Sequence, residues 1–270
     1  MSINGVTYLL DSENNCSVCV IDNFSDDLKE LIRQNLNTVC LGSAKSSSGR
    51  SVYSYPKTLR EFLKRYRDKT DTTKLGMLGE LLCHILLFTL RSDLHAASPF
   101  FNMEESSIKK GFDLIISEKT ETNLWIAEVK SGEVGKSDKD QKIRTLIDKA
   151  KADLLSRLSS SNTTIWHTAI NNVELALAST NKSKDILISY LEEFLEGAEN
   201  LNNAPSGFNV ILAPILFEDC NNPIQLATIC DKASHLSSSG DFAKCIVFAI
   251  QKSTIVKIEE FLYSEAESNK

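Results

Sequence analysis

The sequence lacks the signatures of several large enzyme classes. It contains neither a G-x-x-x-x-G-K-[ST] nor a G-x-G-x-x-G pattern, so we expect no P-loop for ATP and no Rossmann loop for a dinucleotide. Its four histidines form no H-E-x-x-H motif, and no G-x-S-x-G turn is present, which argues against a zinc protease and a Ser-His-Asp hydrolase. Any catalytic chemistry must therefore come from residues outside these motifs.

Long apolar runs and cysteine motifs are also scarce. The longest apolar segment, Leu81–Leu90, is interrupted by His84 and Thr89, so we expect no transmembrane helix. The first fifteen residues lack a basic region and a long apolar core, so we expect no signal peptide. The pair Cys16-x-x-Cys19 has no second half-site at zinc spacing, and seven irregularly placed cysteines favour reduced core thiols in a cytosolic protein.

The net charge of −6 is unevenly distributed. Lys57–Lys69 holds six basic and two acidic residues, and Lys136–Arg157 is also rich in Lys and Arg, whereas acids gather in Glu192–Glu199 and Glu259–Glu267. Such segregation allows a nucleic-acid face in an acidic protein, together with a separate acidic surface. The residues expected to contact nucleic acid are Lys57, Arg60, Lys64, Arg65, Lys136, Lys139, Gln141 and Lys142.

Patterns typical of strands and helices are interspersed along the chain without repeats or a linker, which predicts one compact α/β domain over residues 1–270. The expected strands are Val6–Leu10, Ser17–Ile21, Phe100–Met103, Phe208–Phe217 and Cys245–Ile250. The expected helices are Ser25–Leu36, Pro56–Lys69, Thr72–Arg91, Asp140–Leu158, Thr163–Ser179, Lys184–Ala198, Pro223–His235 and Val256–Ser264, and the expected polar loops are Ser43–Arg50 and Ser131–Lys139.

The stretch Gly111–Gly132 predicts two short strands joined by a polar turn. Asp113 stands at the head of the first strand, and Glu128 and Lys130 stand at the tail of the second. Because strand side chains alternate between faces, Glu128 and Lys130 share one face. Antiparallel pairing would bring Asp113 beside both. Burying this group of charges is costly, and a divalent metal would offset the cost.

A further carboxylate comes from the apolar helix expected at Thr72–Arg91. Glu80 lies in its middle, and Gly76 and Gly79 on its N-terminal side would let another backbone or a ligand come close. Alternatively, Glu80 reaches solvent or pairs with a basic group, because Glu is seldom buried alone. His84 follows on the same helix face and is expected to be a core residue.

These residues together predict a magnesium or manganese site. Hard oxygen ligands suit both ions, and the expected ligands are Glu80, Asp113, Glu128 and the carbonyl of Val129. The metal would activate a water and polarise a phosphoryl oxygen, while Lys130 would orient the water or stabilise the developing charge. The alternative is a set of surface ion pairs that only close the hairpin.

The chain contains G-E on an expected helix, then G-F-D, then A-E-V-K-S-G. With these motifs in this order, the sequence resembles the PD-(D/E)XK nuclease superfamily. It implies a restriction-endonuclease-like mixed β-sheet flanked by helices, with a core at about residues 72–158 on which residues 1–71 and 159–270 pack. Gln141 resembles a glutamine of the RecB-type branch, but Thr145 stands in place of its aromatic companion, and Gly111–Phe112 replaces the usual proline.

Over most of its length the chain is similar to the HamA family, the nuclease subunit of the Hachiman anti-phage defence system. This resemblance implies a cytoplasmic bacterial Mg²⁺-dependent deoxyribonuclease that works with a superfamily 2 helicase and is held quiet by it. It carries the catalytic roles to Asp113, Glu128 and Lys130, with Glu80 as an addition. Two alternatives stay open, a non-catalytic adaptor that binds nucleic acid or a helicase, and an RNA-cutting toxin.

Overall fold

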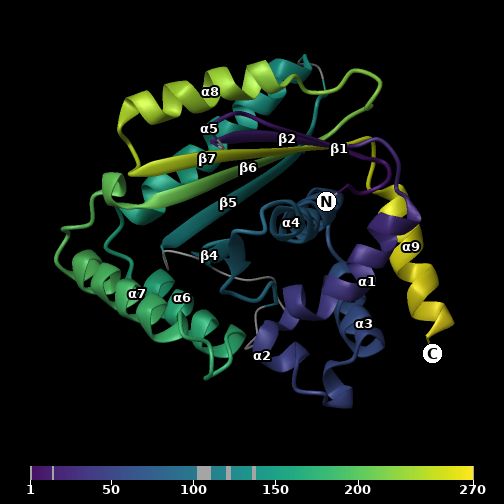
Figure 1. Ribbon diagram of the computed structural model, residues 1–270, viewed down its shortest axis with the longest axis horizontal. Coiled ribbons are helices and arrows are strands. Elements are labelled where there is room, and N and C mark those ends of the chain that lie inside the picture. Colours follow the sequence, from purple (N-terminus) through teal and green to yellow (C-terminus); the bar gives the residue numbers. More distant parts are fainter. Residues whose placement is uncertain (1, 14, 102–110, 120–122, 136–137, 270) are drawn as a thin grey trace.

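One seven-stranded mixed sheet, covered by helices on both faces, organises the structure (Figure 1). The computed structural model describes residues 2–13, 15–101, 111–119, 123–135 and 138–269. The strand order is β1-β2-β7-β6-β5-β4-β3. Strands β2, β7, β6 and β5 run parallel, and the antiparallel strands β1 on one side and β4 and β3 on the other complete the edges. The expected mixed sheet flanked by helices is therefore present.

The strands agree closely with the sequence patterns. They span Val6–Leu10 (β1), Cys16–Ile21 (β2), Leu94–Ala96 (β3), Leu114–Glu118 (β4), Leu124–Glu133 (β5), Asn209–Phe217 (β6) and Lys244–Lys252 (β7). Of these, β3 was not expected. Four of the seven strands come from residues outside 72–158, so both ends of the chain contribute to the same sheet as the hairpin.

Two expectations about strands need correction. The loop expected at Ser131–Lys139 begins later, because β5 stays paired with β6 as far as Glu133 and Phe217. The strand expected at Phe100–Met103 is not one of the seven. Phe100 and Phe101 donate their N–H groups to the carbonyls of Val39 and Cys40, and residues 102–103 lie outside the described part of the chain.

The helices follow the expected order. They span Asp26–Leu41 (α1), Ser43–Ser46 (α2), Tyr55–Tyr66 (α3), Asp71–Leu90 (α4), Lys139–Leu158 (α5), Thr163–Ala176 (α6), Lys184–Glu199 (α7), Leu226–Ser239 (α8) and Val256–Ser268 (α9). The loop expected at Ser43–Arg50 is wrong for its first half, which forms α2. The helix expected from Pro223 begins at Leu226, because the N–H of Ile224 donates to the Gln251 side chain at 2.7 Å.

The sheet separates two apolar cores. One core is built with α1, α3, α4 and α9, and the other with α5, α6, α7 and α8. Alternation along β5 directs Trp125, Ala127 and Val129 to the α4 side, while Ile126 faces the α5 side. By the same alternation, Glu128 and Lys130 project toward α5. Strand β5 is thus contacted by α4 on one face and by α5 on the other.

Helix α4 is the central element of the first core. Its length and composition would also suit a membrane span, but in the structure most of its residues from Met77 onward are buried in the core. Gly79 allows the closest approach to the sheet, since a Cβ there would lie 2.0 Å from Ser131 Oγ. A Cβ at Gly76 would meet nothing within 4 Å. The close approach expected of both glycines is therefore needed at Gly79 alone.

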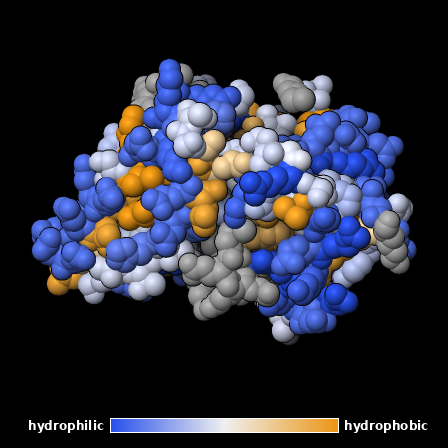
Figure 2. All heavy atoms as spheres, turned by 90° about the horizontal axis from the view of Figure 1, so that it is seen from below, coloured by the Kyte–Doolittle hydropathy of each residue, from blue (hydrophilic) through white to orange (hydrophobic). Residues whose placement is uncertain are grey.

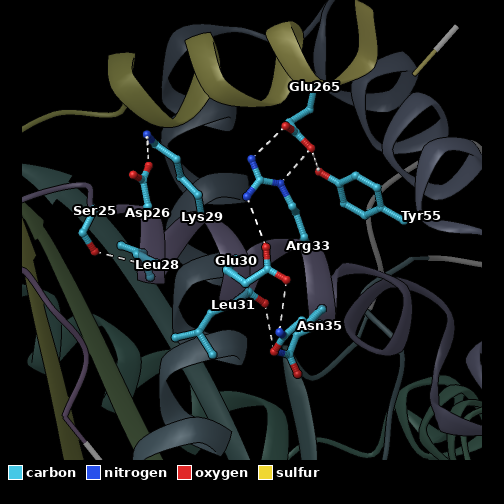
Figure 3. Close-up of polar contacts among 11 residues, drawn as sticks. Ser25, Asp26, Leu28, Lys29, Glu30, Leu31, Arg33, Asn35, Tyr55 and Glu265 are labelled. Carbon is cyan, nitrogen blue, oxygen red and sulfur yellow. Dashed lines mark hydrogen bonds and ion pairs between the residues drawn. The ribbon is translucent and has the colours of Figure 1, made fainter. Parts of the chain in front are cut away.

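The ends of the chain are fastened to the rest of the fold. Arg33 on α1 donates two hydrogen bonds to Glu265 on α9, at 3.0 and 2.9 Å, and the Tyr55 hydroxyl donates a third at 3.0 Å (Figure 3). Hydrogen bonding from Arg33 holds the pKa of Glu265 below its usual value. Helix α9 is therefore joined to α1 and α3, and its buried residues Ile258, Phe261 and Leu262 belong to the same apolar core.

A disulfide corrects the expectation that the cysteines are all reduced. Cys16 on β2 is bonded to Cys230 on α8, across 214 residues of sequence. Cys19 is a buried free cysteine in the opposite core, because neighbouring strand residues two apart share a face and residues three apart do not. The C-x-x-C spacing therefore describes two unrelated cysteines.

Substituting the two glycines of α4 tests how closely this helix must approach β5. Gly79→Ala should lower the free energy of unfolding by about 1–3 kcal/mol, because the new methyl group overlaps Ser131 and crowds Ile215. Gly76→Ala, the matched control, should be neutral or raise it by up to about 1 kcal/mol, because Ala favours a helix. Urea unfolding of both variants measures the difference. Equal effects of the two substitutions would contradict the close approach.

Candidate active site

Asp113 stands where β4 separates from β5. The last residue pair of the two strands is Leu114 with Ala127. Beyond it, the Asp113 carboxylate Oδ2 accepts the N–H of Val129 at 2.7 Å. A side-chain oxygen thus occupies the place of a ladder carbonyl, which fixes the carboxylate beside the end of β5. The hairpin predicted from the sequence is confirmed in its pairing and in this juxtaposition.

Glu128 and Lys130 form a buried ion pair on the α5 side of the sheet. The side chain of Glu128 is 0% exposed, and its Oε1 lies 2.6 Å from Lys130 Nζ. Lys130 Nζ also lies 2.7 Å from Asp153 Oδ2 on α5. The other oxygen of Glu128, Oε2, accepts a hydrogen bond from Arg157 Nη1 at 2.8 Å. Each oxygen of the buried carboxylate therefore forms an ion pair with a different cation, Oε1 with Lys130 and Oε2 with Arg157.

The surroundings shift the pKa of both members of the pair. Burial raises the pKa of Glu128 to about 7, the charge of Asp113 adds to this, and Arg157 and Lys130 oppose it. Burial alone would lower the pKa of Lys130, but Glu128, Asp153 and Asp113 together raise it. Lys130 thus remains a cation at neutral pH, whereas Glu128 is sensitive to pH near neutrality.

Glu80 approaches from the opposite face of the sheet. It lies on α4 with its side chain 13% exposed, and its Oε1 is 3.9 Å from His84 Nε2. The pKa of the Cys83 thiol is raised by burial and further by the charges of Glu80 and Asp113. The charge of Asp113 also raises the pKa of Glu128, so this carboxylate acts on groups from both α4 and β5.

Carboxylates of this kind fit a hard divalent cation. Asp113 and Glu128 carry like charges in a setting where Glu128 is fully buried, and a cation between them would remove the repulsion. Their oxygens are the donors that Mg²⁺ and Mn²⁺ prefer. Within the described residues, however, Glu80, Asp113 and Glu128 do not form a group whose ligand atoms lie within 4.8 Å of one another. Because Lys130 and Arg157 already pair with the two oxygens of Glu128, metal binding by this carboxylate would displace one of them.

An open pocket gives access to the site from one side. It has a volume of about 480 Å³, and Asp113 and Arg157 line it together with the first turns of α6. The hydroxyl-bearing residues Thr164 and Thr168 form that wall. Among the described residues, a ligand in this pocket would meet the carboxylate of Asp113, the guanidinium of Arg157 and uncharged side chains.

The basic residues expected on the helix at 56–69 divide into two kinds. Lys57, Arg60 and Lys64 on α3 are exposed. The side chain of Arg65 is only 9% exposed; it pairs with Glu61 at 2.8 Å and lies over the ring of Phe101. Arg65 therefore contributes to packing of α3, and the exposed three remain candidates for nucleic-acid contacts.

The second expected group lies at the start of α5, on the other face of the sheet from α3 (Figure 1). Lys139 Nζ donates to Asn222 and to the carbonyl of Pro223, which fastens α5 to the loop before α8. Gln141 is exposed, and Lys142 lies beside Gly132. Lys136 lies outside the described residues.

Sequence reasoning missed Asp153 and Arg157. They are four residues apart in the last turns of α5. The resemblance to the nuclease superfamily pointed to Gln141, in the first turn of the same helix. An acid and a base at this spacing usually form a local surface pair. Here each contacts a different residue of β5, so only the packing of α5 on the sheet reveals their place in the site.

The raised pKa of Glu128 makes a prediction about stability. An unfolded Glu loses its proton near 4.5 and the folded one near 7, so the folded state binds the extra proton between these values. The contribution of Glu128 to the free energy of unfolding should therefore fall by about 3 kcal/mol as the pH rises from 4.5 to 7. Urea unfolding of the wild type and of Glu128→Gln across this range measures it. A difference between the two that does not change with pH would contradict the shift.

Comparison with known proteins adds the family. A family model described as HamA matches residues 3–266 of the 270-residue chain. No curated protein matches the chain in a sequence search. The match includes the hairpin, α4 and α5, and thus every residue of the site. Because it spans nearly the whole chain, the protein belongs to the HamA family and is a component of the Hachiman anti-phage defence system.

Proposed function

We propose that this chain is a metal-dependent nuclease that hydrolyses phosphodiester bonds of DNA, with Asp113, Glu128 and Lys130 as its catalytic residues. The observation that carries the proposal is the juxtaposition of two carboxylates and a lysine where β4 leaves β5, beside an open pocket. The helix–strand–strand–helix order around them supports a place in the PD-(D/E)XK superfamily. Burying the charge of Glu128 costs desolvation free energy, which favours a functional role for this residue over a purely structural one.

The residues divide the chemical work among them. Asp113 and Glu128 would hold Mg²⁺ or Mn²⁺, with Glu80 and the Val129 carbonyl as further candidate ligands. When bound, the ion supplies an activated water and polarises the phosphoryl oxygen. Lys130, fixed between Glu128 and Asp153, keeps a positive charge that stabilises the negative charge developing on the phosphate. The hydrogen bond from Val129 N–H orients Asp113.

A protein partner fits the exposed surface of α6 and α7. The large apolar side chains exposed there are Leu175, Ile186, Tyr190 and, just beyond α7, Leu201. Figure 2 shows orange, hydrophobic patches on its left half, which is the side where α6 and α7 lie. Acidic residues from Glu192 to Glu199 lie close by on α7. We propose a superfamily 2 helicase as the partner in the bacterial cytoplasm, which would supply the ATP-dependent step and control cleavage.

A second candidate function is a non-catalytic adaptor. The observation that favours it is that Lys130 and Arg157 already neutralise both oxygens of Glu128, so the group of charges could serve stability alone. An adaptor would bind DNA or the helicase without any need for Asp113 or Glu128. An RNA-cutting enzyme is a further alternative, and replacing DNA by RNA in the cleavage assay described next distinguishes it.

Cleavage of plasmid DNA tests the nuclease. With Mg²⁺ or Mn²⁺ the chain should nick or degrade DNA, and EDTA should abolish this. Glu128→Gln and Lys130→Met should each slow cleavage by about 100-fold or more, because the first removes a proposed metal ligand and the second removes the charge that stabilises the reacting phosphate. Lys149→Gln, an exposed residue of α5, is the matched control and should cut at the wild-type rate.

The assay requires both the isolated chain and its complex with the helicase, because inhibition by the partner would hide activity. Cleavage that survives Glu128→Gln and Lys130→Met unchanged would refute the proposed active site. Anti-phage protection that persists in both variants, without cleavage by either form, would support the adaptor instead.

A further inference from the structure

Arg157 has hydrogen-bonding capacity that the fold does not use. Its Nη1 donates to Glu128 Oε2 and to the carbonyl of Gly111, each at 2.8 Å. Within the described part of the chain, its Nη2 and Nε donate to no protein acceptor. A guanidinium has five N–H donors in one plane, so three remain. With 33% of the side chain exposed, these donors are open to a ligand.

The pocket beside Arg157 has the character of an anion site. Among the described residues that line it, Arg157 is the one cation and Asp113 is the one anion. The Asn162 side chain caps the N–H of Thr164 through Oδ1, which leaves its amide N–H₂ group as a donor. The Thr164 side chain is exposed on the same wall. A guanidinium, an amide and a hydroxyl group, from Arg157, Asn162 and Thr164, therefore line a cavity of about 480 Å³.

A phosphodiester fits this arrangement, and the proposed function favours it over a carboxylate, which a guanidinium fork also binds with two hydrogen bonds. A planar guanidinium fork binds two phosphate oxygens at once, and hydroxyl and amide groups are common further donors to the nucleic-acid backbone. Asp113 on the opposite side would repel the anion unless a cation lies between them, as the proposed nuclease site requires.

We propose that this pocket is the subsite for a DNA phosphate and that Arg157 is its anchor. Arg157 holds Glu128 with Nη1 and binds the phosphate with Nη2 and Nε. The inference rests on the proposed function, because it takes the phosphate to be that of the DNA substrate. It assigns Arg157 a direct contact with substrate in addition to its ion pair with Glu128.

A purely structural role for Arg157 is the alternative, and the chain offers variants that separate the two. Arg157→Lys keeps a cation that can pair with Glu128 but removes the planar fork. Thr164→Val alters the pocket wall without touching Glu128. Lys149→Gln removes one positive charge from the same helix at a residue that does not line the pocket.

The experiment measures binding of a short fluorescein-labelled DNA duplex by the full chain with Ca²⁺, a hard cation that carboxylate oxygens also bind, over a series of salt concentrations. Arg157→Gln should weaken binding by about tenfold and reduce the slope of log K against log salt by about one, the effect of losing one phosphate contact. Arg157→Lys should weaken binding less than Arg157→Gln, and Thr164→Val should weaken it by about threefold. Lys149→Gln should bind as the wild type does. Thermal unfolding confirms that each variant is folded.

A single uncharged methylphosphonate, moved along the duplex, locates the contact. At one position it should weaken binding by the wild type and have no further effect on Arg157→Gln, because both changes remove the same interaction. Unchanged affinity and salt slope in Arg157→Gln, or no DNA binding by the wild type, would overturn the inference. These results are independent of cleavage. A wild type that binds through Arg157 but never cuts refutes the nuclease alone, and one that cuts while Arg157→Gln binds normally refutes the subsite alone.

Discussion

The cost of burying the carboxylate of Glu128 is the constraint on which the site depends. A fully buried carboxylate is stable as an anion only when charges and hydrogen bonds replace its lost hydration. Lys130 from the same strand and Arg157 from α5 provide them. Each is held in turn, Lys130 by Asp153 and Arg157 by the carbonyl of Gly111. Helix α5 packs on the sheet through its apolar side chains, and its last turns thereby place Asp153 and Arg157 beside Lys130 and Glu128.

The sheet determines how the other carboxylates reach this point. Strand β5 lies inside the sheet with α4 on one face and α5 on the other, so Glu80 and Glu128 come from opposite sides. Asp113 sits where β4 leaves β5 and influences both Cys83 on α4 and Glu128. Without a Cβ at Gly79, the neighbour of Glu80 in the chain, α4 packs against Ser131 of β5. The opening of the hairpin is where Asp113 meets the end of β5 that carries Glu128 and Lys130.

The remainder of the chain is joined to this arrangement. The N-terminal hairpin β1–β2 and the C-terminal strands β6 and β7 belong to the same sheet as the site. The Cys16–Cys230 disulfide joins β2 to α8, and the Arg33–Glu265 pair joins α1 to α9. The family model matches residues 3–266, which include all seven strands of this sheet. The regulation by a partner proposed above would act on the surface, where α6 and α7 expose apolar and acidic groups.

Local patterns in the sequence determined most of the elements and half of the site. Period-two alternation identified β4 and β5 and showed that Glu128 and Lys130 share a face, because that geometry depends only on the strand itself. The apolar circumference of residues 72–91 predicted that α4 is buried. Only the tertiary structure decided which residues complete the site. Asp153 and Arg157 join it because α5 packs on β5 with its last turns over Glu128, and Arg65 is removed from the exposed cations because it packs on Phe101. Cys16 meets Cys230 through the packing of α8 on β2. Contacts between residues far apart in the chain have no spacing rule, so no motif could have shown them.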